Sequence, residues 1–226
     1  MSHPGRLQGK RVLLTQASRY MGPATVELFR QEGAEVIADD RDLRADGAVE
    51  ALVDEAGQID ILVANLAPDP EFGIACIEIK ESDFRLMFET LVYPLHRLCR
   101  AILPGMYARK QGKVIVYGSA LGLRAFEGAA AYGTARTAQI GYVRHAGMEA
   151  ARHNVQINLI AQNFVENEYF SAELQNTDAF RDMMKSVPIG RLATGEEDAR
   201  FAAFLASNEA NFFVGQSFPF AGGWKE

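Results

Sequence analysis

The sequence predicts a single α/β domain over residues 1–226, built on a doubly wound parallel sheet in a three-layer αβα arrangement. Apolar runs of strand length alternate with longer segments of helical period along the whole chain. No linker, repeat or low-complexity segment divides the 226 residues. A hydrophobic content of 48% and a charged content of 23% are ordinary for a globular protein, so this length supplies one sizeable core.

The first elements form two strand–helix units. Val12-Leu13-Leu14 lies in a short buried strand at 11–14, and a helix at 23–31 follows, with Val26, Leu28 and Phe29 as its apolar positions. Gly33-Ala34 turns the chain into a second strand at 35–38. Residues 48–55 then predict a helix and 59–64 a third strand.

The middle of the chain carries two long helices. Residues 83–109 have apolar side chains on one side of a helix, which we expect Pro94 to kink. A strand at 113–117 follows and ends at Gly118. A second long helix at 130–152 leads into a strand at 155–160.

The last elements are a helix at 198–206, preceded by the acidic turn Glu196-Glu197, and a strand at 213–220. The long, mixed stretch 162–188 between them predicts a flap with short helices on the substrate side. Repeated strand–helix–strand units with right-handed crossovers give a parallel sheet with helices on both faces.

Composition excludes several classes of protein. A net charge of -6 argues against nucleic acid as a partner, since phosphate binding requires a basic surface. No apolar run approaches the length of a membrane span and the first ten residues are polar, so we expect a cytoplasmic protein with no membrane partner. Cys76 and Cys99 lie in apolar runs and predict reduced core cysteines. The histidines lack metal-ligand spacing, so no metal is expected.

The most informative segment is Thr15–Gly22, which follows the first strand and opens a helix. Dinucleotide-binding folds carry a glycine-rich loop there, because the backbone must turn tightly and approach a pyrophosphate. Only Gly22 is a glycine; Gln16 lies in the turn, and Tyr20 stands where a cofactor would lie. The sequence therefore predicts a filled nucleotide site and no NAD(P). The alternative is that Tyr20 is a core aromatic under the first helix.

Three residues form a candidate catalytic group. Ser119 lies at the carboxyl end of a strand, where open α/β sheets place their sites, and Tyr132 and Arg136 share a helix face four residues apart. A cation beside a phenol favours the phenolate. A charge pair at ~4 Å is worth roughly 4 kcal/mol at a protein surface, whereas lowering a tyrosine pKa by two units needs about 2.7 kcal/mol. Tyr132 is therefore a candidate general base and Ser119 a candidate ligand of the substrate oxygen. A packing or solvated Tyr-x-x-x-Arg pair is the alternative.

The chain resembles the short-chain dehydrogenase/reductase superfamily over nearly its whole length, which implies a Rossmann-like fold. The matching pieces are Thr15–Gly22, Asp60–Asn65, Leu103–Met106, Ser119, Tyr132 and Ala221–Gly223. Ordinary members have glycines at the positions of Gln16 and Tyr20, a lysine at that of Arg136, and an asparagine near Leu91.

These departures resemble one branch, the halohydrin dehalogenases of the shorter B type. Thr15, Tyr20 and Gly22 match its loop motif, and Ser119 followed by Tyr132 and Arg136 matches its catalytic motif. The resemblance implies a cofactor-independent lyase. Ser119 and Tyr132 hold the hydroxyl of a vicinal haloalcohol, Arg136 lowers the pKa of Tyr132, and the alkoxide expels halide to form an epoxide. Azide, cyanide or nitrite would open epoxides in the reverse reaction.

The resemblance also implies which residues bind halide and substrate. The halide would lie after the strand at 155–160, although Ala161-Gln162 stands where relatives commonly have Pro-Gly. Tyr20 would form a pocket wall. Phe126 either lines the pocket or anchors a loop, and Tyr169 either covers the substrate or belongs to a hydrophobic surface patch. The candidate residues are Tyr20, Phe126, Gln162, Asn163, Phe164, Val165 and Tyr169.

Two other functions stay open. One is an NAD(P)-dependent short-chain oxidoreductase with a degenerate cofactor loop, and the other is a non-catalytic binding protein on the same scaffold. Because relatives pair the two long helices, and because both helices are apolar on more than one side here, a homotetramer is expected.

Overall fold

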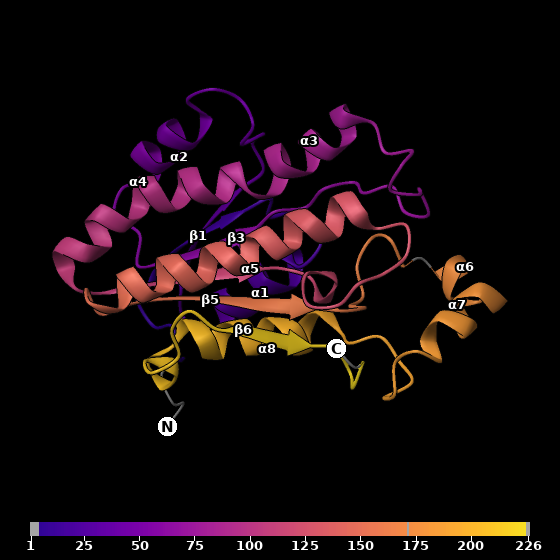
Figure 1. Ribbon diagram of the computed structural model, residues 1–226. Helices are drawn as coiled ribbons and strands as arrows, with labels where there is room; N and C mark the ends of the chain where they lie inside the picture. The colour runs from indigo at the N-terminus through magenta and orange to yellow at the C-terminus, as the bar shows by residue number, and fades with distance from the viewer. Residues whose placement is uncertain (1–4, 171, 225–226) are drawn as a thin grey trace.

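A six-stranded parallel sheet forms the centre of the computed structural model, which describes residues 5–170 and 172–224 (Figure 1). The strand order is β2-β1-β3-β4-β5-β6. From β1 the chain adds β2 toward one edge of the sheet, and from β3 it adds β4, β5 and β6 toward the other edge, so the strand order reverses between β1 and β3. The strands are β1 Arg11–Thr15, β2 Glu35–Asp39, β3 Ile61–Asn65, β4 Gly112–Tyr117, β5 Val155–Gln162 and β6 Ser217–Phe220. This topology confirms the predicted doubly wound α/β fold.

Helices cover both faces of the sheet. The principal helices are α1 Gly22–Gln31, α2 Ala48–Ala56, α3 Glu81–Leu91, α4 Tyr93–Arg109, α5 Ala130–Ala151 and α8 Gly195–Ala206. One hydrophobic cluster packs α2 to α5 on one face of the sheet, and another packs α1 and α8 on the opposite face (Figure 1). Every residue of β3 and β4 is buried, as expected for strands covered on both faces.

Short helices occupy the ends of the sheet. They are η1 Ala120–Gly122, η2 Asn208–Ala210, α6 Ala172–Gln175 and α7 Asp178–Met184. Helices α6 and α7 project beyond the carboxyl ends of β5 and β6 (Figure 1). They lie in the stretch predicted to be a flap with short helices.

Three predictions about the elements are wrong in detail. The helix predicted over 83–109 is two helices that meet at Val92, because Pro94 has no N–H for the next helical bond. The last strand begins at Ser217 rather than at Phe213, and Gly215 before it has φ +69. Cys76 is exposed rather than in the core, whereas Cys99 is buried.

No helix within residues 5–170 and 172–224 is both long enough and apolar enough to cross a membrane.

Candidate functional site

Ser119 lies just beyond the carboxyl end of β4. Gly118 precedes it, and a Cβ at Gly118 would lie 2.6 Å from a methyl group of Leu159, so glycine lets this turn approach β5. The Ser119 side chain is buried and its Oγ accepts a hydrogen bond from the Leu121 N–H at 3.2 Å, which caps η1. That bond uses Oγ as an acceptor, and no hydrogen bond donated by this hydroxyl is found within residues 5–170 and 172–224, so its proton can be offered to a substrate oxygen.

Tyr132 and Arg136 lie one turn apart near the start of α5. The Arg136 Cζ is 5.1 Å from the centre of the Tyr132 ring, and no hydrogen bond among the described residues joins the guanidinium to the phenol. The cation therefore meets the ring face. Helix η1, which Ser119 caps, packs closely on this turn of α5, since a Cβ at Gly122 would lie 2.9 Å from the Arg136 backbone. Ser119, Tyr132 and Arg136 thus belong to one packed unit.

Arg136 is a buried cation held by neutral acceptors. Its side chain is 4% exposed. Its Nη1 donates to the Tyr117 carbonyl and to Gln139 Oε1, both at 2.9 Å, and its Nη2 donates to the Leu66 carbonyl at 3.2 Å. Its Nε is buried without a partner in the described chain. Because none of these acceptors is a carboxylate, the positive charge is not cancelled beside Tyr132.

Gln139 is a residue that the sequence reasoning missed. It is fully buried, accepts from Arg136 and donates from its Nε2 to the Leu91 carbonyl at 2.9 Å. It therefore ties α5 to the end of α3. Its position three residues after Arg136, on the same helix face, was the available signal.

The β1–α1 loop keeps a glycine-type backbone without the glycines. Gln16 has φ +46 and Tyr20 has φ +49, in the left-handed region that favours glycine. The Gln16 side chain accepts from the Ala67 N–H, and the Tyr20 hydroxyl donates to the Pro68 carbonyl at 2.6 Å. These bonds to the segment after β3 hold both side chains in place.

Tyr20 lies against Tyr169, with the two ring centres 5.0 Å apart. Burial raises the pKa of Tyr20 most, the hydrogen bond with Tyr169 adds to the rise, and the positive charge of Arg136 opposes it.

The segment between β5 and α6, residues 163–170, is attached to the β1–α1 loop by contacts that the sequence did not predict. The Glu168 carboxylate accepts from the Tyr20 N–H at 3.0 Å. Arg19 pairs with Asp69 at 2.6 Å, and the Tyr169 hydroxyl accepts from Arg19 and donates to Asp69. Glu168 and Tyr20 are 148 residues apart, so no local pattern in the sequence indicated this contact.

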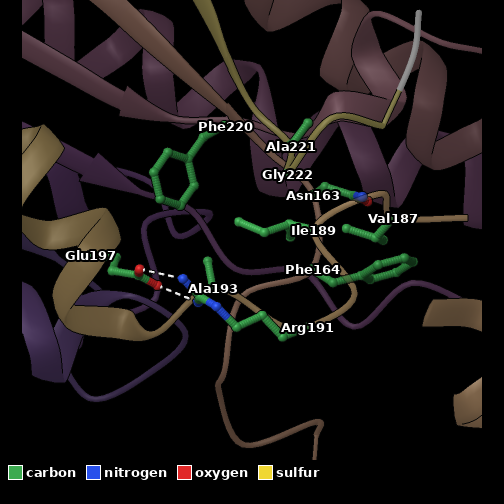
Figure 2. A pocket seen from close by; sticks show the side chains of 10 residues that line it. All are labelled: Asn163, Phe164, Val187, Ile189, Arg191, Ala193, Glu197, Phe220, Ala221 and Gly222. Atoms are coloured by element: carbon green, nitrogen blue, oxygen red, sulfur yellow. Dashed lines mark hydrogen bonds and ion pairs between the residues drawn. The ribbon is translucent and has the colours of Figure 1, made fainter. Parts of the chain in front are cut away.

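Two cavities adjoin these elements. One of about 200 Å³ is lined by Asn163, Phe164 and Phe220, and in Figure 2 the Arg191–Glu197 ion pair, at 2.7 Å, lies at its edge. The other, of about 310 Å³, borders the β1–α1 loop. Neither cavity is lined by Ser119, Tyr132 or Arg136. The candidate site is therefore identified by the packing of these three residues and not by the size of a cavity.

The structure separates the residues predicted to bind halide and substrate. Tyr20 and Tyr169 lie together, and Asn163 and Phe164 line the smaller cavity, where the Asn163 Nδ2 is buried without a partner among the described residues. Phe126 is 57% exposed and lines neither cavity.

Gln162 and Val165 have structural contacts instead. The Gln162 side chain donates to Asp198 Oδ2 at 2.5 Å. Val165 is 1% exposed and pairs with Ala193 in an isolated bridge.

Comparisons with known proteins connect the chain to reductases. A family model described as "Enoyl-(Acyl carrier protein) reductase" matches residues 6–225. A 3-oxoacyl-[acyl-carrier-protein] reductase of Vibrio cholerae is 31% identical, with 96% of this chain and 98% of the relative covered. Among solved structures, one titled "Dehalogenation enzyme" has a TM-score of 0.88 at 30% identity, covering 97% of this chain and 99% of that one. A 3-oxoacyl (acyl-carrier-protein) reductase of Agrobacterium tumefaciens with NADP bound has a TM-score of 0.88 at 25% identity, covering 96% and 95%.

These comparisons correct two expectations. The prediction of a lyase is contradicted, because several curated relatives are named as 3-oxoacyl-[acyl-carrier-protein] reductases and another as a dehydrogenase/reductase. The prediction of a cofactor-independent enzyme conflicts with the same relatives and with the reductase family model. The sequence reasoning gave the altered loop more weight than the similarity along the rest of the chain.

Proposed function

Because the chain belongs to the family described as enoyl-(acyl carrier protein) reductase, within the short-chain dehydrogenase/reductase superfamily, we propose that it is an oxidoreductase. Its substrate would be a small molecule with a carbonyl or alcohol oxygen. The observation that carries this proposal is the packed unit of Ser119, Tyr132 and Arg136 beyond the carboxyl end of β4. Open α/β sheets bind their ligands at that edge.

Each residue has a distinct role in this proposal. Ser119 donates its hydroxyl proton to the substrate oxygen, and Tyr132 exchanges a proton with that oxygen. Arg136 places a positive charge over the Tyr132 ring, with its guanidinium carbon 5.1 Å from the ring centre.

The loop residues do not fit a nicotinamide dinucleotide in the arrangement described. The Tyr20 N–H beside the start of α1 is hydrogen-bonded to Glu168, and the Tyr20 ring lies against Tyr169. A phosphate group there would meet the Glu168 carboxylate, a like charge. Reduction therefore requires residues 163–170 to move away from the loop before a dinucleotide can bind there.

Dehalogenation of haloalcohols is a second candidate, favoured by one specific observation. The solved structure titled "Dehalogenation enzyme" covers nearly all of this chain at 30% identity. In that reaction Tyr132 would take the hydroxyl proton, the alkoxide oxygen would bond to the neighbouring carbon, and the carbon–halogen bond would break to release halide.

Two assays on the purified protein test these candidates. The first supplies NADPH with an acetoacetyl thioester and follows loss of the reduced nicotinamide absorbance. The second supplies 1,3-dichloro-2-propanol without nicotinamide and measures chloride release. Turnover lost in Tyr132→Phe supports whichever reaction is observed. Turnover in neither assay, or turnover retained in the variant, overturns the proposed role of the site.

A further inference from the structure

We infer that Glu168 is a specificity-determining residue: its carboxylate occupies the anion position at the start of α1 and competes there with the phosphates of a nucleotide. This role rests on the proposed function, which requires residues 163–170 to move away from the β1–α1 loop, but it concerns nucleotide binding and not turnover. Both carboxylate oxygens lie close to the Tyr20 nitrogen, at 3.0 and 3.2 Å. Tyr20 lies two residues before Gly22, where α1 begins.

Helix α1 has no anion of its own. Its N-cap, Met21, makes no side-chain cap, and its first turn contains no acidic residue. Helix α8, in contrast, is capped by Thr194 and Glu197 and carries three acids in its first turn. The N-terminus of a helix favours negative charge, and in α1 that charge comes from a distant segment.

Residues 163–170 are held so that Glu168 reaches the loop. Val165 pairs with Ala193 near the start of this segment, and Asn167 Oδ1 accepts from the Tyr169 N–H at 2.9 Å in a tight turn. At its far end the Tyr169 hydroxyl bridges Arg19 and Asp69. The segment is therefore attached on both sides of Glu168.

The charges around the loop disfavour a second anion. Arg19 pairs with Asp69 at 2.6 Å and lies 3.6 Å from Glu168, so two carboxylates surround one guanidinium. The three groups together carry one net negative charge. Neutralising Glu168 leaves Arg19 and Asp69 balanced, so a phosphate oxygen can compete with a neutral acceptor for the Tyr20 N–H.

The space for the rest of a nucleotide is present. The cavity of about 310 Å³ reaches from Gln16 and Ser18 in the loop to Arg44 after β2. The ligand class that Glu168 disfavours is therefore a nucleoside diphosphate, with its nucleoside in this cavity and its phosphates at the start of α1.

Calorimetric titration of the full chain with ADP tests the competition. We expect Glu168→Gln, which removes the charge and keeps the size, to bind ADP at least about tenfold more tightly than the wild type. Glu166→Gln is the matched control, because it removes the same charge from an exposed position two residues away. No gain in Glu168→Gln, including undetectable binding in both proteins, or an equal gain in Glu166→Gln overturns the inference.

Amide hydrogen exchange at Tyr20, measured without nucleotide or substrate, tests the contact by itself. Glu168→Ala removes the acceptor, so exchange at Tyr20 should accelerate by about tenfold, and Glu166→Ala should leave it unchanged. Unchanged exchange in Glu168→Ala would show that the carboxylate does not hold this N–H in solution. Neither measurement depends on turnover, so a failed assay of the proposed function leaves both results interpretable.

Discussion

At the scale of single residues, Arg136 is unusual because it is a buried cation that no carboxylate contacts within the described residues. A buried guanidinium usually faces a carboxylate, which cancels its charge. Arg136 faces two backbone carbonyls and Gln139, so its hydrogen bonds are largely satisfied and its charge stays available. The ring centre of Tyr132 lies 5.1 Å from the guanidinium carbon, and the same charge opposes the rise in the pKa of Tyr20.

Removal of one hydroxyl tests the proposed proton transfer. Tyr132→Phe should lower kcat/KM by at least about 100-fold, the usual contribution of a positioned acid or base. The aromatic ring and its edge contact with Phe72, at 5.5 Å, remain in this variant. Circular dichroism should therefore match the wild type, and an unfolded variant would make the loss of turnover uninformative about the hydroxyl.

Removal of the Arg136 guanidinium tests how much its hydrogen bonds contribute to the stability of the fold. Arg136→Met leaves the Tyr117 and Leu66 carbonyls without this donor, and each buried unpaired group costs about 1–3 kcal/mol. Urea denaturation should show a fall of about 2–5 kcal/mol in the free energy of unfolding. Arg136→Lys, which keeps a donor and the charge, should lose less. Equal stability of Arg136→Met and the wild type would contradict this account of the carbonyls.

At the scale of elements, the site is assembled from the ends of strands and the helices that follow them. The end of β4 supplies Ser119, α5 supplies Tyr132 and Arg136, and the β1–α1 loop supplies Tyr20. Strand order brings β1, β3, β4 and β5 side by side, so segments far apart in sequence share one edge of the sheet. Helix α8 supports this edge through the bond between Asp198 and Gln162.

Asp198 in the first turn of α8 should make stability depend on pH. Burial raises its pKa to about 8, and the hydrogen bond from Gln162 opposes the rise. The folded state therefore binds a proton that the unfolded state releases above pH 3.8, and the stabilisation is lost as pH rises through about 8.

Asp198→Asn carries no such proton. The free energy of unfolding of Asp198→Asn minus that of the wild type should rise between about pH 5 and about pH 8, by at most about 1.4 kcal/mol per pH unit. Above about pH 8 this difference should stay constant. Glu196→Gln, in the same turn but exposed, is the control. A difference that does not change with pH would contradict a protonated Asp198.

Gly22 tests the packing at the start of α1. A Cβ there would lie 2.3 Å from the Ala17 carbonyl oxygen, so the loop must shift to accept it. Gly22→Ala should lower the free energy of unfolding by about 1–3 kcal/mol in urea denaturation. Gly141→Ala is a matched control, because a Cβ at this helical glycine meets no atom within 4 Å. Equal effects of the two substitutions would contradict the close approach to Ala17.

At the scale of the whole molecule, two cores on opposite faces of one sheet hold the site rigid. Their helices also present apolar side chains outward: Met148 of α5 is 68% exposed and Tyr93 of α4 is 50% exposed. Such residues on the long helices agree with the expected association of these helices between copies of the chain.

The homotetramer stays a prediction with a direct measurement. Light scattering after gel filtration should give four times the 24.9 kDa of one chain. Met148→Glu should lower that mass if α5 pairs with a second copy, because the introduced carboxylate would be buried in the interface. A monomeric wild type would contradict the expected assembly.

The sequence by itself determined the parallel αβα architecture and the positions of Ser119, Tyr132 and Arg136 on their elements. Both follow from local spacing: apolar periodicity defines strands and helices, and a separation of four residues puts two side chains on one helix face. It also identified Gln16 and Tyr20 as departures from a glycine loop. It predicted a kink at Pro94 but not two separate helices that meet at Val92. It also did not predict the exposure of Cys76 or the short last strand, because tertiary contacts decide burial and the ends of elements.

Only the tertiary structure decided which groups meet around these residues. Glu168 reaches the Tyr20 N–H across 148 residues, and Arg136 bonds to the Leu66 carbonyl across 70. Contacts of this kind depend on strand order and on the path of residues 163–170, and no repeat or spacing in the chain encodes them. The physical reason is that local patterns determine the direction of a side chain within its own element, whereas packing of the elements determines which charge it meets.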